Sequence, residues 1–293
     1  MIKKHFAAHV LMFNCSSFIL RMIDNCAPFV DKIYVAYSEV PFSYNSRSRL
    51  QISNPTDKSI LNNSKYFNKI HLIEGIWEKD EDARNDCLKQ AKIDGFDYLI
   101  IQDADEFYFA EDYRNNLDQI NSNLDYDVYV SPWHVFWKNS NYVIEFKDKK
   151  VTEYNAGFAI NCKTVKKFDR SRTVVSKKIF FLTGLCYHFA YALTDIELRC
   201  KINTWLHSVE FNRDSWFRRK WLLWHESTIN LHPVNPAGWR RAVRFEGKLP
   251  LEMSDYEFPK IRLLESNLLE KIWCIFEDIK IMFIERSKSL IRK

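Results

Sequence analysis

The chain has 293 residues, of which 46% are hydrophobic and 28% charged, and its formal net charge is +5. This length suffices for one large domain, or one domain with an appendage, around a sizeable core. The mild charge, with no basic stripe, argues against a nucleic-acid-binding protein, and the 6 glycines argue against a barrel or sandwich rich in tight turns.

The cysteines and the N-terminus bear on the compartment. Seven cysteines are an odd number, are widely scattered and form no C-x-x-C pair, which is typical of neither a zinc site nor a disulfide framework. The first apolar run is interrupted by His9 and Asn14, so we interpret it as a strand rather than a signal peptide. The sequence contains no uninterrupted run of 18 apolar residues, so we predict no transmembrane helix. We therefore expect a cytoplasmic protein, with possible peripheral contact at the inner face of a membrane.

Strands and helices alternate over the first 105 residues. The expected strands cover 6–13, 32–37, 70–73 and 98–101, the expected helices cover 18–26 and 80–92, and a polar, turn-rich segment covers 41–68. Asp80 can cap the second helix and Gly95 follows it as a stop. This alternation predicts a parallel, helix-flanked sheet and a nucleotide-binding half.

The rest of the chain mixes further strands and helices. We expect helices at 111–124, 163–168 and 263–291, and strands at 128–137, 142–146, 158–161 and 179–182. Thr194 and Glu197 form the capping box of another helix. The prolines after residue 226 predict little regular structure there. We expect a domain at 1–252 and an amphipathic helical tail at 253–293.

The most informative stretch is Asp103-Ala-Asp105, directly after an expected strand. Alternate residues of an extended segment share a face, so the two carboxylates could share a divalent cation at the carboxyl end of a strand, where open α/β sheets hold ligands. The same geometry turns Glu106 to the opposite face, where it braces the turn. The alternative is a charged turn that closes an ordinary strand.

Taken in order, several motifs resemble glycosyltransferases of the GT-A fold. They are Asn14, Ala83-Arg84-Asn85, Asp103-Ala-Asp-Glu-Phe107, His188-Phe-Ala-Tyr191, Lys201-x-x-x-Trp205-x-His207-Ser208 and Leu231-His-Pro233 with Leu249-Pro250. They are similar to a family-2-like group found in bacterial and viral glycan pathways. The resemblance covers roughly residues 6 to 252. One departure is Asn14-Cys15, where many relatives carry Asn-Glu-Glu.

This resemblance implies a GT-A α/β fold, with a mixed, mainly parallel sheet flanked by helices. It implies metal-dependent transfer of a sugar, with inversion, from a nucleotide-sugar donor (a UDP- or GDP-sugar foremost) to a glycan or lipid-linked acceptor in surface polysaccharide synthesis. Mn²⁺ or Mg²⁺ would bridge Asp103, Asp105 and the donor's pyrophosphate, with His188 completing the metal shell. The second aspartate is then the surer ligand, and Asp103 reaches the donor.

Further residues are candidates for binding the donor. Asn14, Ser38 and Glu39 follow the first two strands, where such proteins contact the base and ribose, and Arg84 could approach a phosphate. The alternative for Ser38 and Glu39 is a solvated turn. For Arg84 the alternative is a surface ion pair with an acidic residue of its own helix.

An inverting transferase also needs a base and an acceptor pocket. The usual distance from the acidic motif points to Asp195 as the base, with Glu153 as the alternative, although Asp195 could serve only the helix N-terminus. His134 and Trp133 are the candidates for the acceptor pocket, with core packing as their alternative.

Other segments leave more than one interpretation open. His207 is a weaker metal or phosphate candidate than His188, and His232 is expected to be structural. The aromatic and basic stretch 216–224 could form acceptor surface, membrane interface or core. The final helix, amphipathic with a basic end, could lie on an anionic membrane, pack on the domain or form a homodimer.

Two other functions use the same residues. One is a metal-dependent nucleotidyltransferase or phosphohydrolase, although the chain has no G-x-x-x-x-G-K-[ST] loop. The other is a non-catalytic carbohydrate-binding protein. The sequence does not identify the base and sugar of the donor, the acceptor or the linkage.

Overall fold

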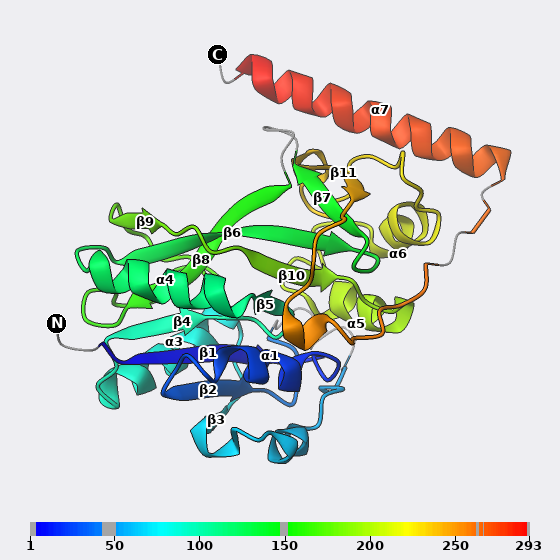
Figure 1. Cartoon of the computed structure of the whole chain (residues 1–293). Coiled ribbons are helices and arrows are strands. Elements are labelled where there is room, and N and C mark those ends of the chain that lie inside the picture. Colours follow the sequence, from blue (N-terminus) through cyan, green and yellow to red (C-terminus); the bar gives the residue numbers. More distant parts are fainter. Residues whose placement is uncertain (1–3, 43–50, 147–151, 262–263, 266, 292–293) are drawn as a thin grey trace.

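The computed structural model describes residues 4–42, 51–146, 152–261, 264–265 and 267–291 (Figure 1). The expected turn-rich residues 43–50 and the basic residues Arg292 and Lys293 lie outside this range. The strands are β1 (Phe6–Met12), β2 (Lys32–Tyr37), β3 (Ile70–Glu74), β4 (Tyr98–Ile101), β5 (Glu106–Tyr108), β6 (Val128–Trp137), β7 (Tyr142–Phe146), β8 (Glu153–Asn161), β9 (Ile179–Phe181), β10 (Cys186–Tyr191) and β11 (Trp239–Arg244). The α-helices are α1 (Ile19–Cys26), α3 (Asp80–Ile93), α4 (Ala110–Ser122), α5 (Asp195–Thr204), α6 (Arg213–Trp216) and α7 (Leu268–Ile291).

The strands of the described residues belong to one 11-stranded sheet, with the order β11-β7-β6-β8-β4-β1-β2-β3. Strands β9 and β10 add to β6, and β5 adds to β10. The pairings β1–β2, β1–β4 and β2–β3 are parallel, and β8 is antiparallel between β4 and β6. Following the pairings outward from β1, only β5, β7 and β8 oppose its direction. The prediction of a mixed, mainly parallel sheet flanked by helices is therefore confirmed.

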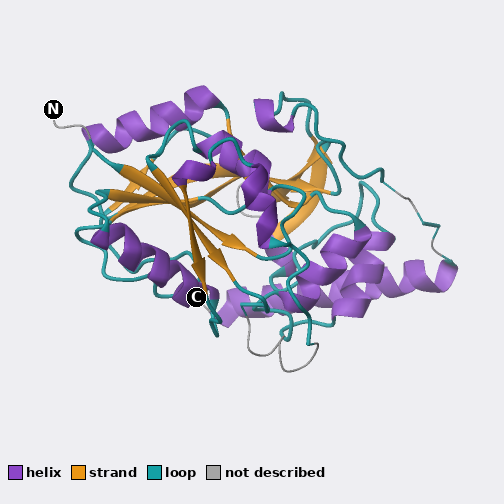
Figure 2. Cartoon of the chain, turned by 90° about the horizontal axis from the view of Figure 1, so that it is seen from below, coloured by secondary structure: helices purple, strands orange, loops and turns teal. Residues whose placement is uncertain are grey.

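Helices lie on both sides of the sheet (Figure 2), and the alternation of side chains along β1 contributes to a core on each side. Phe6, Ala8 and Val10 point into the larger core, where α1 packs. Ala7 points into the smaller core together with residues of α3, so that His9, two residues on, lies on the α3 side. Because of this alternation, only side chains on the α3 side of β1 lie on the same side of the sheet as α3.

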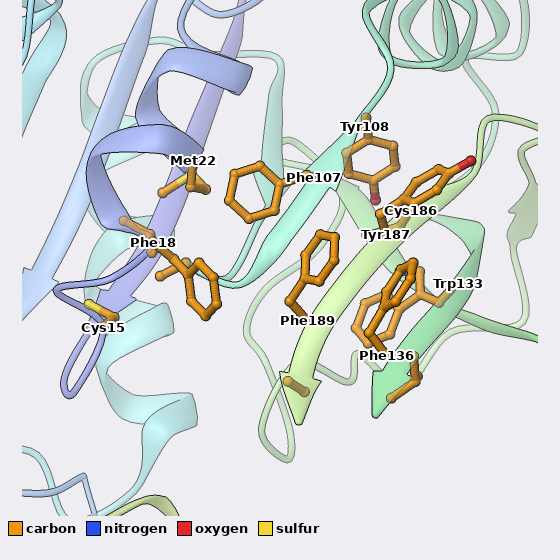
Figure 3. Close-up of a cluster of buried hydrophobic side chains, with 14 of the residues drawn as sticks. Cys15, Phe18, Met22, Phe107, Tyr108, Trp133, Phe136, Cys186, Tyr187 and Phe189 are labelled. Atoms are coloured by element: carbon orange, nitrogen blue, oxygen red, sulfur yellow. The ribbon is translucent and has the colours of Figure 1, made fainter. Parts of the chain in front are cut away.

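A group of buried rings holds β5 and β10 beneath α1 (Figure 3). Phe107 of β5 lies 6.2 Å from Phe18 and 5.8 Å from Phe189 of β10, measured between ring centroids. Phe189 also stacks on Phe136 of β6 at 4.4 Å. These three ring contacts fix the position of β5, which follows the acidic turn, and of β10, which pairs with it. Tightly packed aromatic rings leave little freedom for one strand to slide past another.

Two local expectations are wrong. Residues 163–168, expected as a short helix, form a turn and an irregular segment, because their backbone groups bond to side chains of α3: the carbonyl of Val165 accepts from Lys92 and the N–H of Phe168 donates to Asn85. The segment after residue 226 was expected to be irregular. It contains β11, which pairs with β7 because the prolines lie outside the paired residues.

Helix α7 runs along the outside of the protein, at the top of the view in Figure 1. Three of its acidic side chains face the body of the protein: Glu270, Glu277 and Asp278 contact Arg218, Arg219 and Lys220 of the π-helical segment Phe217–Leu222. Its large apolar side chains are exposed, among them Leu268, Leu269, Trp273 and Phe276. In the described part of the chain, no helix combines the length and hydropathy that crossing a bilayer requires.

Candidate active site

The acidic turn departs from extended geometry directly after β4. The backbone N–H of Glu106 donates to the carbonyl of Asp103 at 3.0 Å, which closes a turn over residues 103–106. The premise that alternation places Asp103 and Asp105 on one face, with Glu106 opposite, is therefore wrong. Asp105 has partners of its own, whereas Asp103 and Glu106 share Arg172.

Asp103 is held by two arginines. Arg84 of α3 donates from one nitrogen to both carboxylate oxygens, at 2.9 and 3.0 Å, and Arg172 donates at 3.2 Å. Burial acts to raise the pKa of Asp103, but the charges of Arg84 and Arg172 prevail and lower it to about 2. The alternative role of Arg84, an ion pair at the helix surface, does not describe this side chain, because Arg84 is 2% exposed.

His9 supports Arg84 from the neighbouring strand. Its Nδ1 lies 3.0 Å from the carbonyl of Ile100, which can only accept, so Nδ1 carries the proton. The Nε2 atom is then the acceptor for Arg84 at 3.2 Å. Burial, followed by the charge of Arg84, lowers the pKa of His9 to about 3, so the ring is neutral. The strand-side histidine thus orients the arginine without adding charge.

Asp105 has a lysine and a histidine as partners from the other side of the site. Lys201 of α5 lies 3.1 Å from Oδ2, and Nε2 of His188 on β10 lies 3.3 Å from Oδ1. Burial acts to raise the pKa of Asp105, but Lys201 and His188 hold it well below its usual range. Nδ1 of His188 is buried and, among the described residues, has no hydrogen-bond partner.

Glu106 is fully buried and is bonded to Arg172. Burial raises the pKa of Glu106, while the charge of Arg172 opposes that shift. Its carboxylate nevertheless lies close to the other two candidate ligands: atoms of Asp105, Glu106 and His188 all lie within 4.8 Å of one another. Oxygen and imidazole donors in this number suit Mn²⁺, and the oxygens suit Mg²⁺. Among the described residues, this group is the set that can hold a cation, and it includes Glu106 rather than Asp103.

The acidic turn lies in the wall of a cavity of about 870 Å³, which is large enough for a sizeable ligand. Asp103, Asp105, Arg84, His188 and Lys201 line one part. A second part is lined by Trp205, His232, Asn235, Gly238 and Trp239, from the end of α5 and the start of β11. One opening therefore joins a charged end to an aromatic end.

The candidates for donor binding divide into two groups. Asn14 lines the cavity in a left-handed conformation (φ 49°), and its side chain donates to the carbonyl of Glu197. Arg84 lines it as well. Ser38 is buried and accepts from the backbone N–H of Val40, and neither Ser38 nor Glu39 is among the described residues that line the cavity.

The two candidate bases occupy different surroundings. Asp195 accepts a hydrogen bond from the indole of Trp221 at 2.7 Å and is not among the described lining residues. Glu153, at the start of β8, lines the cavity with an exposed side chain. Among the described residues, Glu153 has no ion-pair partner, whereas Asp195 is held at the start of its helix.

The candidates for the acceptor pocket also differ. Trp133 lines the cavity, with its ring 4.6 Å from His188 and 4.4 Å from the guanidinium of Arg172. His134 points away, because neighbours on β6 face opposite sides, and its Nδ1 bonds to the carbonyl of Thr152. Of this pair, Trp133 alone reaches the cavity among the described residues.

Sequence reasoning missed Arg172 and did not place His232 at the cavity. Arg172 lies in an irregular segment with no motif around it, and only the fold brings it to Asp103 and Glu106. His232 was expected to be structural, but it lines the cavity. His207, the weaker metal candidate, is hydrogen-bonded through Nδ1 to Glu210 and is not among the described lining residues.

No family model and no curated protein matches this sequence. Among solved structures, similarity extends to glucosyl-3-phosphoglycerate synthase from Mycobacterium tuberculosis in complex with Mn²⁺, UDP and phosphoglyceric acid, with 10% identity, a TM-score of 0.43, and coverage of 69% of this chain and 76% of that one. The S. aureus TarS fragment 1–349 in complex with UDP is 14% identical, with a TM-score of 0.39 and coverage of 76% and 72%. A putative glucose-1-phosphate thymidylyltransferase from Bacillus anthracis is 11% identical, with a TM-score of 0.39 and coverage of 71% and 97%.

Proposed function

We propose that this chain is a GT-A-type glycosyltransferase that moves a sugar from a nucleotide-sugar donor to a glycan acceptor with the help of a divalent metal. The observation that carries the proposal is the grouping of Asp105, Glu106 and His188 in a large cavity that follows the parallel strands. Ligands of open α/β sheets bind at this edge. A UDP- or GDP-sugar is the donor we propose first.

Asp105 and His188 would be the principal ligands of Mn²⁺ or Mg²⁺, and Glu106 the third. When bound, such a cation would neutralise the negative charge that develops on the departing nucleoside diphosphate. Arg84 and Arg172 hold Asp103 in one orientation, in which it can accept hydrogen bonds from donor hydroxyls. Lys201 beside Asp105 adds a further positive charge at the diphosphate.

Glu153 is the residue we propose as the base that deprotonates the acceptor hydroxyl. A base must reach the acceptor and must have a free carboxylate. Glu153 lines the cavity and has no ion-pair partner among the described residues. The carboxylate of Asp195, by contrast, already accepts the indole N–H of Trp221.

We further propose that the exposed apolar face of α7 rests on a membrane that carries the acceptor as a lipid-linked glycan. Trp273 and Phe276 lie on this face, and the sequence of the same helix ends in basic residues. In a flotation assay, the native protein should rise with anionic vesicles. The double variant Trp273→Asp with Phe276→Asp should not rise with them. A second copy of the chain is the competing occupant. If α7 binds a second copy, the native protein is a dimer and does not float.

The test of the proposed function is a thermal-shift screen of UDP-, GDP-, CMP- and dTDP-sugars with Mn²⁺ and with EDTA. The matching donor should raise the melting temperature with Mn²⁺ only, because a ligand that binds the folded state stabilises it by RT ln(1 + [L]/Kd). Product analysis then decides the reaction. A released nucleoside diphosphate with a new glycoside supports glycosyl transfer, whereas pyrophosphate release identifies a nucleotidyltransferase. Binding of a sugar without any metal dependence, with the nucleotide-sugar left intact, identifies a non-catalytic protein.

A further inference from the structure

The aromatic end of the cavity, defined here as Trp205, His232, Asn235 and Trp239, is built from two segments that are distant in sequence. Trp205 follows the last residue of α5, and Trp239 is the first residue of β11. The rings meet around His232, whose centroid lies 4.7 Å from that of Trp239 and 6.1 Å from that of Trp205. The rings of Trp205 and Trp239 are both partly exposed in the cavity.

The protonation state of His232 follows from its neighbours. Its Nδ1 accepts backbone N–H groups from Val234 at 3.1 Å and Asn235 at 2.9 Å, so this atom carries no proton. The proton therefore lies on Nε2. Burial, followed by the charge of His207, lowers the pKa of His232 to about 4. The ring is thus neutral near pH 7 and offers one N–H donor.

Three side chains that line this end carry an N–H donor with no acceptor among the described residues. The described residues provide no acceptor for Nε2 of His232 or for the indole N–H of Trp205 or Trp239. The rings also offer apolar faces, and none of the four side chains is charged at neutral pH. A pyranose fits this chemistry because it has hydroxyl oxygens that accept hydrogen bonds and C–H faces that pack on aromatic rings.

Continuous packing connects the aromatic end to the acidic turn. Trp239 lies 5.0 Å from the ring of Tyr191, and Nζ of Lys201 lies 5.5 Å from the same ring and 3.1 Å from Asp105. All four residues line one cavity. A sugar bound at the aromatic end therefore lies in the same opening as the donor that the proposed function places at Asp105.

We propose that Trp205, His232 and Trp239 form the subsite for a neutral pyranose unit of the acceptor. The assignment of this sugar to the acceptor rests on the proposed function. The sugar site itself is inferred from the geometry of the three side chains. Trp133, the residue expected at the acceptor from the sequence, lies against His188 and Arg172 at the charged end. It would contact the reacting sugars rather than this more distant unit.

The experiment measures direct binding of simple sugars by saturation-transfer NMR. The probes are the methyl glycosides of glucose, galactose, mannose and N-acetylglucosamine, with methyl glucuronide as the charged analogue. At least one neutral glycoside should bind the native protein. His232→Asn keeps an acceptor for the two backbone N–H groups and removes the Nε2 donor, which should weaken binding about fivefold, as expected for one lost hydrogen bond. Trp205→Ala should weaken it by at least as much.

The controls separate this inference from the proposed function. Phe181→Ala removes an exposed ring of β9 that does not line the cavity, and it should bind the sugar as the native protein does. Donor binding with Mn²⁺ should be unchanged in Trp205→Ala and His232→Asn. Unchanged sugar binding in both variants, no binding of any neutral glycoside, or preference for the glucuronide would overturn the subsite. If the native protein shows no Mn²⁺-dependent binding of any nucleotide-sugar, but binds a neutral glycoside that the two variants bind more weakly, only the proposed transfer is overturned.

Discussion

At the charged end of the cavity, Asp103 and Asp105 are each held by two cationic or imidazole side chains, whereas the aromatic end carries no charge at neutral pH. The charged end is rigid because a buried charge without a partner is costly, so each partner fixes the next. The aromatic end depends instead on ring faces and single N–H donors. The difference suggests that one end is organised to stabilise developing charge and the other to recognise shape.

The largest expected effect separates the two candidate bases. Glu153→Gln should lower the transfer rate by roughly 10²- to 10⁴-fold, because a positioned base contributes about that much. Asp195→Asn should lose far less, since Asp195 is outside the described cavity lining and bonded to Trp221. Single-turnover rates with saturating donor provide the measurement. The reverse ranking would restore Asp195 as the base.

Arg172 tests how much the charged end depends on its buried partners. Arg172→Met leaves Glu106 buried without its cation and should cost roughly 3–5 kcal/mol of unfolding free energy, as for other broken buried ion pairs. Urea denaturation measures the loss. Adding Glu106→Gln should recover part of it.

The matched control for this prediction is Arg170→Met, two residues earlier and exposed. Its effect should stay within about 0.5 kcal/mol, as is usual for surface positions. Equal losses at Arg170 and Arg172 would show that the loop, rather than the charge cluster, sets the stability.

The two aspartates should differ in what their loss removes. Asp105→Asn should weaken Mn²⁺ binding and lower the transfer rate roughly 10²-fold or more, because Asp105 belongs to the candidate metal group. Asp103→Asn should retain more Mn²⁺ affinity and weaken donor binding instead, because its carboxylate is held by Arg84 and Arg172. Calorimetric titration with Mn²⁺ distinguishes the two. Equal losses of metal affinity would place both carboxylates in the metal shell.

The sequence predicted the parallel half of the fold well. Strand β1 and helix α3 have clear periodicity and caps, and parallel strands joined by helices follow from their alternation. Strands β5, β10 and β11 were not predicted. They are short or rich in aromatic residues, and their pairing partners are distant in sequence, so local pattern contains little information about them.

The site was predictable only where a motif and a strand end coincide. The motifs singled out Asp103, Asp105 and His188, which line one cavity in the structure, and their roles stay predictions. The turn at Asp103 changed the geometry, however, because alternation applies only to extended backbone, and it brought Glu106 within reach of Asp105. Arg172 could not be found from a pattern, since a buried ion pair formed across 66 residues has no local signature.

The smallest expected effect concerns His232 and tests the neutrality of the aromatic end. The pKa of His232 is lowered from 6.5 to about 4 in the folded protein, so between these values the unfolded state binds more protons. The contribution of His232 to the free energy of unfolding should therefore be fully present above about pH 6.5 and should fall as the pH drops toward 4. His232→Asn removes this contribution, so its unfolding free energy should fall less between pH 7 and 4.5, by about 1–2 kcal/mol once solvent screening of the partly exposed ring is allowed for. Some decline should remain, because His9, with a pKa lowered to about 3, titrates in the same window.

Urea denaturation at both pH values measures the two slopes, with the exposed His225→Asn as a control for the loss of a histidine. Parallel declines in native and His232→Asn protein would mean that His232 is not held neutral by its surroundings, and the aromatic end would then gain a positive charge in mild acid like any exposed histidine.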